Sequence, residues 1–176
     1  FDQYAEAITD SLINSEIAPD ELPLLIMESG RSLIDDAGYL LGTVLATKRL
    51  ANGSRATIID IGVNLLFTSF WYEHKITPAQ SFGQHTEETV VYGPLCMNID
   101  VIRQKVTLPP LNKGDHVVVS AIGAYNMTQW LQFITYRPNI IMIDMQGRPH
   151  LIREKENLEV FNSLEKTPDH LKNFDL

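Results

Sequence analysis

The sequence of 176 residues lacks the features that mark several large classes of protein. Its one cysteine, Cys96, excludes an intrachain disulfide framework and is typical of a reducing compartment, so we expect a cytoplasmic protein. No apolar run is long enough to predict a membrane span. Lys and Arg form no cluster and the net charge is −8, which argues against a nucleic-acid partner. We find no internal repeat, no low-complexity segment and no metal-binding pattern, so a globular domain is the expectation.

The sequence contains enough apolar material for one domain with a core, because 44% of its residues are hydrophobic and the mean hydropathy is −0.06. Residues 2–14 repeat apolar side chains at helical spacing and predict an amphipathic helix. Residues 22–27 form a continuous apolar run, which predicts a strand buried on both faces. This run leads into Glu28, Gly30 and Arg31, at the kind of strand end where α/β folds bind ligands.

From residue 38 onward the sequence alternates short β-favouring segments with turn signals. The predicted strands are residues 38–49, 56–62, 64–72, 89–92, 101–108, 116–124 and 139–144, with turns at residues 52–53, 112–115 and 146–147. Residues 126–134 are predicted as a helical turn or short helix with Trp130, Leu131 and Ile134 inward, and residues 76–86 as a mobile polar loop. Residues 167–169 indicate the start of a short helix capped by Thr167.

This order of elements is lopsided, with one helix and one strand before a body rich in strands. A single helix and strand cannot close a parallel layer, because the strand needs a neighbour on each side. We therefore predict a mainly β fold: an antiparallel β-barrel or sandwich over residues 35–152. Residues 1–34 are expected to be the last helix and strand of a larger (β/α) barrel domain, and residues 153–176 a C-terminal tail with a short helix.

The only cysteine lies directly after a break in a β-branched run. Gly93 and Pro94 interrupt this run, so Cys96 is predicted where a strand gives way to a loop. A lone cysteine is more often an inert core residue than a reactive one. The position can equally aim the thiol into a cleft, and the other motifs of the chain decide between the two interpretations.

Several short motifs occur in an order that resembles a known family. They are Glu28-Ser29-Gly30-Arg31, Asp60-Ile61-Gly62, Gly93-Pro94-Leu95-Cys96 and Gly114-Asp115 followed by Gly123-Ala124-Tyr125, with Phe133 eight residues further on. The series resembles the fold-type III pyridoxal-phosphate decarboxylases that act on diaminopimelate, ornithine and arginine. The resemblance covers nearly the whole chain and departs at Ser29, where the family has proline. It implies a homodimer with a shared active site, and a (β/α)8 barrel before the β-domain.

The resemblance also implies a role for each matched residue. Glu28 corresponds to the carboxylate that keeps the ring nitrogen of pyridoxal 5'-phosphate protonated. Gly30, Arg31 and Tyr125 correspond to cofactor-binding residues, the last two to ligands of the phosphate. Cys96 corresponds to the proton donor, which comes from the partner subunit. The lysine that binds the cofactor covalently has no match here, so we expect these 176 residues alone to be inactive.

On the substrate side, Tyr72, Glu73, Met97 and Phe133 correspond to residues of the shared cleft. Two positions depart from the diaminopimelate enzymes. Met97 stands where they have an acidic residue, and Thr68 where they have an arginine for the distal carboxylate. We therefore expect a substrate other than diaminopimelate: a basic amino acid without a distal carboxylate, or a bulkier conjugated amino acid.

Other interpretations remain open at this stage. Glu28 and Arg31 are also compatible with a surface ion pair, and Tyr125 with a barrel core residue. The parent protein can be a non-catalytic homologue that regulates a partner or drives dimerisation, or a free-standing β-domain. The intact set of cofactor-site residues favours the enzyme, because a scaffold has no need of them.

Overall fold

The computed structural model describes residues 1–15 and 17–172, which fall into two compact units, Phe1–Gly30 and Arg31–Leu176. The first unit contains the predicted helix as α1 (Asp2–Ile13), followed by the 3-10 turn η1 (Pro19–Glu21). The strand predicted at residues 22–27 is wrong: this segment has no regular secondary structure, and Leu24 is 86% exposed. A strand forms only by pairing with another strand, and the segment has no paired neighbour among the described residues.

The second unit is mainly β, as predicted. Its helical elements are α2 (Arg31–Ile34), η2 (Asp35–Ala37), η3 (Phe67–Phe70), α3 (Leu158–Asn162) and η4 (Asp169–Leu171). Its strands are β1 (Tyr39–Arg49), β2 (Arg55–Ile59), β3 (Ile76–Pro78), β4 (Glu87–Tyr92), β5 (Val101–Leu108), β6 (His116–Ser120), β7 (Ile140–Ile143) and β8 (Pro149–Arg153). Among the described residues, no helix is long and apolar enough to cross a membrane.

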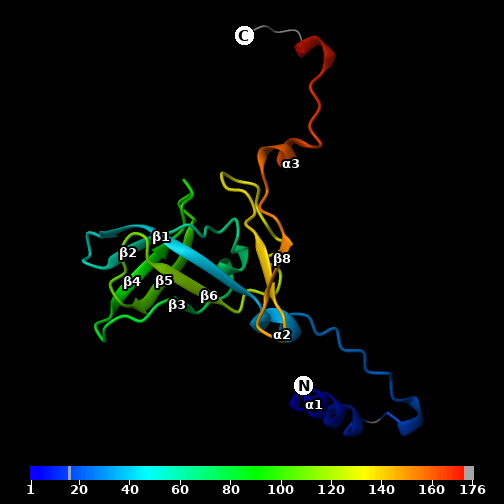
Figure 1. Cartoon of the computed structure of the whole chain (residues 1–176). Coiled ribbons are helices and arrows are strands. Elements are labelled where there is room, and N and C mark those ends of the chain that lie inside the picture. The colour runs from blue at the N-terminus through cyan, green and yellow to red at the C-terminus, as the bar shows by residue number, and fades with distance from the viewer. Residues whose placement is uncertain (16, 173–176) are drawn as a thin grey trace. The chain divides into compact units, whose positions relative to one another are not determined.

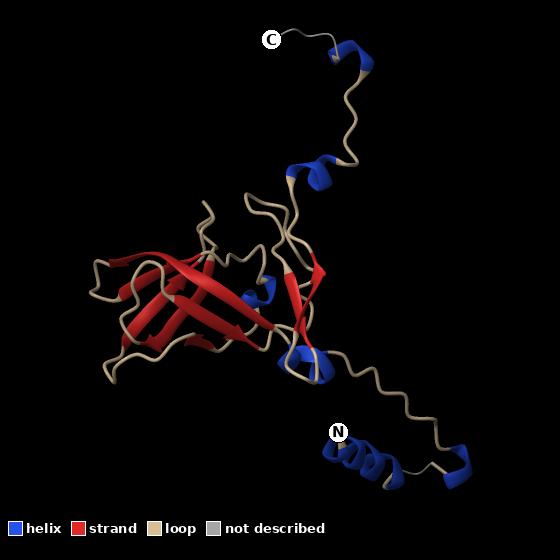
Figure 2. Ribbon diagram, viewed as in Figure 1, coloured by secondary structure: helices blue, strands red, loops and turns tan. Residues whose placement is uncertain are grey.

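Six strands form one curled sheet in the order β3-β6-β1-β2-β4-β5, while β7 and β8 form a separate hairpin (Figure 1). The strands wrap around a common interior, and the two edge strands β3 and β5 contact each other (Figure 2). The sheet is mixed rather than antiparallel throughout, because β2 and β4 are parallel. The connection between them passes through β3 at the far edge of the sheet, so the chain returns beside β2 in the same direction.

Most of the predicted strands are confirmed, and the errors have local causes. Residues 64–72 form turns and η3 instead of a strand, because the amides of Leu65 and Leu66 both donate to the Gly62 carbonyl. Residues 126–128 form a hydrogen-bonded turn, in which the amides of Thr128 and Gln129 both donate to the Tyr125 carbonyl, but residues 126–134 form no helix. Ile134 is 64% exposed instead of facing inward. The loop predicted at residues 76–86 contains the short strand β3, and β8 was not predicted. The last short helix begins after Pro168 as η4, without a side-chain cap from Thr167.

The three predicted turns are confirmed, and two of them close the hairpins β1–β2 and β7–β8. In the β1–β2 turn the Gly53 amide donates to the Leu50 carbonyl, and in the β7–β8 turn the Gly147 amide donates to the Asp144 carbonyl, both over 2.9 Å. The glycine of each turn has a positive φ, which glycine adopts without a Cβ penalty.

The core lies inside the curled sheet. It is built from residues of the strands and of the segments that follow β2, β4, β5 and β6: Val44, Ile59, Ile61, Val63, Leu66, Ile76, Val91, Leu95, Ile102, Leu108, Leu111, Val117, Val119 and Ile122. Leu95 places this core directly beneath the loop that carries Cys96.

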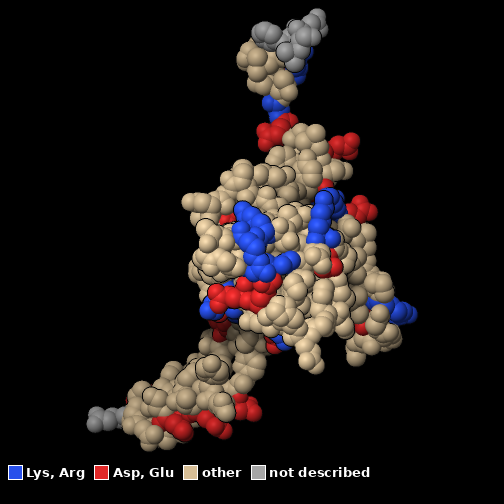
Figure 3. Space-filling view, turned by 90° about the vertical axis from the view of Figure 1, so that its left-hand side faces the viewer, with Lys and Arg blue, Asp and Glu red and all other residues tan. Residues whose placement is uncertain are grey.

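On the surface of the sheet, side chains of opposite charge lie next to one another. The face shown in Figure 3 carries basic side chains directly beside acidic ones. Glu87 of β4 accepts from Arg49 over 2.5 Å and from Arg55 over 3.2 Å, and Lys105 lies 2.5 Å from Glu88. Such pairs contribute little to the free energy of folding when exposed.

Candidate functional site

Cys96 lies in the loop between β4 and β5, and its side chain is exposed. The loop is held from below by Asp100, which is 3% exposed. Its carboxylate accepts from the amide of Leu95, the residue before Cys96, over 2.6 Å, and from the amide of Val63 over 2.8 Å. A Cβ on Gly93 would overlap this carboxylate, which explains the glycine of the motif. The Cys96 loop is therefore fixed by a buried carboxylate that sequence reasoning missed.

The environment of Asp100 acts on its ionisation. Burial raises the pKa of the Asp100 carboxyl above its ordinary value, and the hydrogen bonds from Val63 and Leu95 partly oppose this shift. The two amide donors thus offset part of the cost of burying this carboxyl group.

The residue next to Val63 extends the same anchor to a second segment. Asn64 is fully buried, and its amide nitrogen donates to Thr135 Oγ1 over 2.6 Å. The backbone carbonyl of Asn64 accepts from the amide of Leu131 over 3.2 Å. The stretch that follows Gly62 therefore holds both the Cys96 loop and the segment that carries Phe133.

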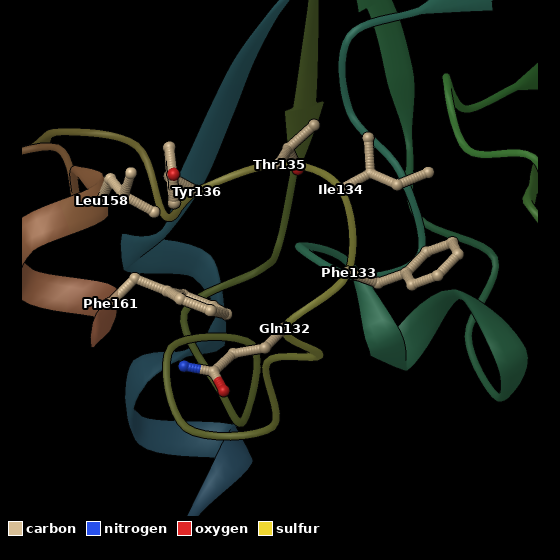
Figure 4. Close-up of a pocket in the computed structure, with 7 residues that line it drawn as sticks. All are labelled: Gln132, Phe133, Ile134, Thr135, Tyr136, Leu158 and Phe161. Atoms are coloured by element: carbon tan, nitrogen blue, oxygen red, sulfur yellow. The ribbon is translucent and has the colours of Figure 1, made fainter. Parts of the chain in front are cut away.

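Phe133 borders a pocket that is open to solvent. The pocket is lined by Gln132, Phe133, Ile134, Thr135, Tyr136, Leu158 and Phe161. Figure 4 shows the Phe133 ring directed away from Phe161, on the opposite side of the segment. Phe133 is 39% exposed. The pocket is mostly apolar and offers no charged side chain, so it does not account for recognition of an anionic cofactor.

A second group of predicted residues gathers around Arg31 and Asp35. Arg31 Nη2 lies 2.6 Å from the buried Asp35 carboxylate, one helical turn later in the chain. The other oxygen of Asp35 accepts from the amide of Ala124 over 3.3 Å, and its backbone carbonyl accepts from the amide of Gly123 over 3.0 Å. Asp35 therefore joins Arg31 to the segment that presents Tyr125.

The Arg31 guanidinium is held in one orientation, but one of its hydrogen-bond donors has no partner in the described part of the chain. It stacks on the Tyr72 ring, with 3.4 Å between its central carbon and the ring centroid. Nη1 of Arg31 is buried and has no hydrogen-bond partner among the described residues. A buried cationic donor without a partner is costly, and an anion placed there would satisfy it.

Tyr125 has an unusual backbone conformation, with a φ of 69°. Its side chain is 48% exposed. Its carbonyl accepts from the amides of Thr128 and Gln129 over 2.9 and 2.8 Å. A non-glycine residue in the left-handed region is uncommon and marks a conformation imposed by its surroundings.

A buried network of Thr68, His74 and Asn126 lies beside this turn. Thr68 Oγ1 lies 2.7 Å from His74 Nε2 and 2.8 Å from Asn126 Oδ1. Burial lowers the pKa of His74, and the backbone groups of Ser120 and Ala121 partly oppose this effect. Thr68 is fully buried, and its hydroxyl is engaged by both partners.

The remaining predicted residues are Glu28, Gly30, Glu73 and Met97. Glu28 and Gly30 belong to the first unit and are exposed there. Glu73 lies 3.1 Å from Arg103 of β5, and its side chain is 86% exposed. Met97 is half-buried and packs against the hydrophobic core. Within the described part of the chain, no cluster of His, Cys, Asp or Glu could hold a metal ion.

Sequence signals were present for some of the residues that were missed. Arg31 and Asp35 have the i,i+4 spacing of a helical ion pair. Asp100 ends the short loop that begins at Gly93-Pro94, a position from which an acidic side chain can accept hydrogen bonds from the amides of the loop. Asn126 had no signal, because its partners Thr68 and Ile122 are set by the tertiary fold.

Comparisons with known proteins bear directly on these motifs. A family model described as the C-terminal sheet domain of the pyridoxal-dependent decarboxylases matches residues 31–123, more than half of the chain. The chain belongs to the pyridoxal-dependent decarboxylase family. The family predicted from the motifs is therefore confirmed, and with it pyridoxal phosphate as the family's cofactor.

Individual relatives agree with this assignment. The sequence is 30% identical over 169 residues to the diaminopimelate decarboxylase of Helicobacter pylori, which covers 93% of this chain and 39% of that protein. The structure of M. jannaschii diaminopimelate decarboxylase in complex with L-lysine matches with a TM-score of 0.81 and 29% identity, over 95% of this chain and 38% of that one. Vibrio vulnificus lysine/ornithine decarboxylase complexed with cadaverine matches with a TM-score of 0.62 and 26% identity, over 75% and 35%. The chain thus spans well under half the length of these relatives.

The residues of the decarboxylase domain fit the phosphate end of this cofactor. A phosphate is recognised by a planar guanidinium and by hydroxyl donors. Arg31 offers a buried, unpartnered Nη1, and Tyr125 offers a phenol on a half-exposed side chain. Asp35 links the two through its ion pair and its bond to Ala124. Arg31 and Tyr125 would therefore hold the phosphate.

Proposed function

We propose that this chain is the C-terminal part of a pyridoxal-phosphate-dependent amino-acid decarboxylase, a carboxy-lyase. The observation that carries the proposal is the linkage of Arg31 to the Ala124–Tyr125 turn through the buried Asp35. Asp35 pairs with the Arg31 guanidinium and accepts from the Ala124 amide, next to Tyr125, while Nη1 of Arg31 has no partner among the described residues. A phosphate bound there would satisfy this buried donor.

Each of the proposed site residues then has a chemical role. The bound cofactor supplies an electron sink for the negative charge that decarboxylation leaves on the α-carbon. Glu28 favours the protonated ring nitrogen on which that sink depends. Arg31 and Tyr125 hold the phosphate and so fix the orientation of the ring. Cys96 gives a proton to the α-carbon, and its loop is held in place by Asp100.

The active site is proposed to be shared between two subunits of a cytoplasmic homodimer. The exposed position of Cys96 at the tip of a rigid loop supports this, because a proton donor offered to a neighbouring subunit has to lie on the surface of its own domain. The 176 residues alone are proposed to be inactive, since the lysine for the covalent cofactor link has no match among them.

The substrate is proposed to lack the distal carboxylate of diaminopimelate, although several relatives are diaminopimelate decarboxylases. The hydroxyl of Thr68 is engaged with His74 and Asn126, so this position offers no group to a carboxylate. Met97 packs on the core and carries no charge. Tyr72 and Phe133 would supply apolar cleft surface, and Glu73 a carboxylate for an amine. A basic amino acid or a bulkier conjugated amino acid fits such a site.

Carbon dioxide release by the full-length protein with pyridoxal phosphate tests this proposal across diaminopimelate, ornithine, lysine and arginine. We expect diaminopimelate to be turned over less efficiently than the preferred substrate by about tenfold to a thousandfold, because its distal charges would be left unpaired. The Met97→Glu variant should reduce the difference in efficiency between diaminopimelate and the preferred substrate. Turnover of diaminopimelate at least as efficient as the others would overturn the substrate assignment. Absence of both cofactor binding and carbon dioxide release would favour a non-catalytic homologue.

A further inference from the structure

The backbone around Tyr125 forms a strained turn. The Asn126 amide donates to the Ala124 carbonyl over 2.9 Å, and Tyr125 between them has a φ of 69°. These are the features of the γ-turn with positive φ, a rare and strained form. Such a conformation persists only where the surroundings over-determine it.

The side chain of Asn126 supplies the contacts that hold this turn. Its amide nitrogen donates to the Ala124 carbonyl over 3.2 Å and to the Ile122 carbonyl over 3.1 Å. Its oxygen accepts from the amide of Thr68 over 3.2 Å. This orientation of the amide is the only one that matches every partner, because the flipped form would set donor against donor and acceptor against acceptor. Asn126 thus clamps both ends of the segment that leads into Tyr125.

Two further residues fix Asn126 in turn. The Thr68 hydroxyl has a single proton, and it donates that proton to Asn126 Oδ1, an oxygen that can only accept. His74 Nε2, at 2.7 Å from the same hydroxyl, must therefore be the donor to it. All three side chains are buried, with exposed fractions of 0% for Thr68, 3% for His74 and 6% for Asn126.

We propose that Asn126 is a positioning residue for Tyr125, with Thr68 and His74 behind it. The clamp holds Tyr125 in its strained turn, so that its hydroxyl is presented to the cofactor phosphate together with Arg31. This inference rests on the proposed function. It assigns the buried Thr68, at the position of the missing arginine, to the support of the phosphate site instead of to the substrate.

The test measures the affinity of the full-length protein for pyridoxal phosphate and for pyridoxal, which lacks the phosphate, by the visible absorbance of the bound ligand. Asn126→Ala is expected to weaken pyridoxal phosphate binding by about tenfold or more and to leave pyridoxal binding unchanged. Tyr125→Phe should show the same phosphate-specific loss, and combining the two changes should add little to either alone.

Two further variants separate positioning from simple loss of stability. Asn64→Ala removes another buried amide, one that binds Thr135 instead of the Tyr125 turn, and should leave the ratio of the two affinities unchanged. Thr68→Val keeps the side-chain shape but removes the hydroxyl that orients Asn126, and it covers the case in which Asn126→Ala does not fold. It should give a smaller loss of the same phosphate-specific kind.

The outcomes distinguish this inference from the proposed function. Wild-type protein that binds no pyridoxal phosphate overturns both. Wild-type protein that binds it, with Asn126→Ala and Thr68→Val binding it equally well, overturns the positioning role alone. The positioning role is also overturned if Asn126→Ala weakens the binding of pyridoxal and of pyridoxal phosphate to the same extent. Such an equal loss would indicate a general loss of stability.

Discussion

Replacing Asp100 with alanine is expected to lower the free energy of unfolding by about 2–6 kcal/mol. The change leaves the buried amides of Val63 and Leu95 without an acceptor, and each unsatisfied buried donor costs about 1–3 kcal/mol. Urea unfolding of the full-length protein, followed by its tryptophan fluorescence, to which Trp71 and Trp130 contribute, measures the loss. Hydrogen exchange at the amides of Val63 and Leu95 should speed up in the variant.

Asp100→Asn is the matched control, because it keeps the shape and one acceptor oxygen but turns an NH₂ group toward the second amide. It should be destabilised less than Asp100→Ala. An Asp100→Ala protein whose unfolding free energy stays within about 0.5 kcal/mol of the wild type would show that the loop does not depend on this carboxylate.

Asp100 also predicts a dependence of stability on pH. Because the pKa of Asp100 is raised in the folded protein, the folded state binds more protons than the unfolded state in the window just above the ordinary aspartate pKa. The contribution of Asp100 to stability is therefore largest at low pH and falls as the pH rises through this window. The difference in unfolding free energy between the wild type and Asp100→Asn should therefore become smaller as the pH rises through this window.

Much of the sheet could be predicted from sequence because its strands alternate apolar and polar residues and end at recognisable turns. β5 was predicted with its observed bounds, and the Asn52-Gly53 turn forms as expected. Residues 22–27 failed because an apolar run indicates burial, and burial in a strand depends on partners outside the segment. The parallel pairing of β2 and β4 could not be predicted from the sequence either, because it depends on the path of the long connection between the two strands.

The candidate site was predicted in its parts but not in its arrangement. Arg31, Tyr125 and Cys96 stand out through their motifs. The residues that hold them do not, because a carboxylate such as Asp35 acts on a backbone amide 89 positions later in the chain. Thr68 shows the same limit: sequence comparison gives its position but not the direction of its hydroxyl, which faces Asn126.

Replacing Cys96 with alanine is expected to lower the rate of carbon dioxide release by about 10²–10⁴-fold, because the α-carbon loses its positioned proton donor. Pyridoxal phosphate affinity should stay unchanged, since the phosphate ligands Arg31 and Tyr125 belong to a separate group of contacts. Steady-state kinetics with the preferred substrate and a cofactor titration measure the two quantities.

Cys96→Ser keeps the size of the side chain but offers a much weaker acid, so it should lose nearly as much activity as alanine. A Cys96→Ala enzyme with the full rate would exclude the thiol as the proton donor. A parallel loss of cofactor affinity would indicate instead that Cys96 supports the fold of the site.

The central claim is that Arg31 and its surroundings form the phosphate site of a pyridoxal-phosphate enzyme. The most direct measurement is a titration of the full-length protein and its Arg31→Ala variant with pyridoxal phosphate, followed by visible absorbance. We predict saturable binding at one site per chain in the wild type, weakened by about tenfold or more in Arg31→Ala, where the charged donor is lost. Absence of binding in the wild type, or equal binding by the two proteins, would contradict the claim.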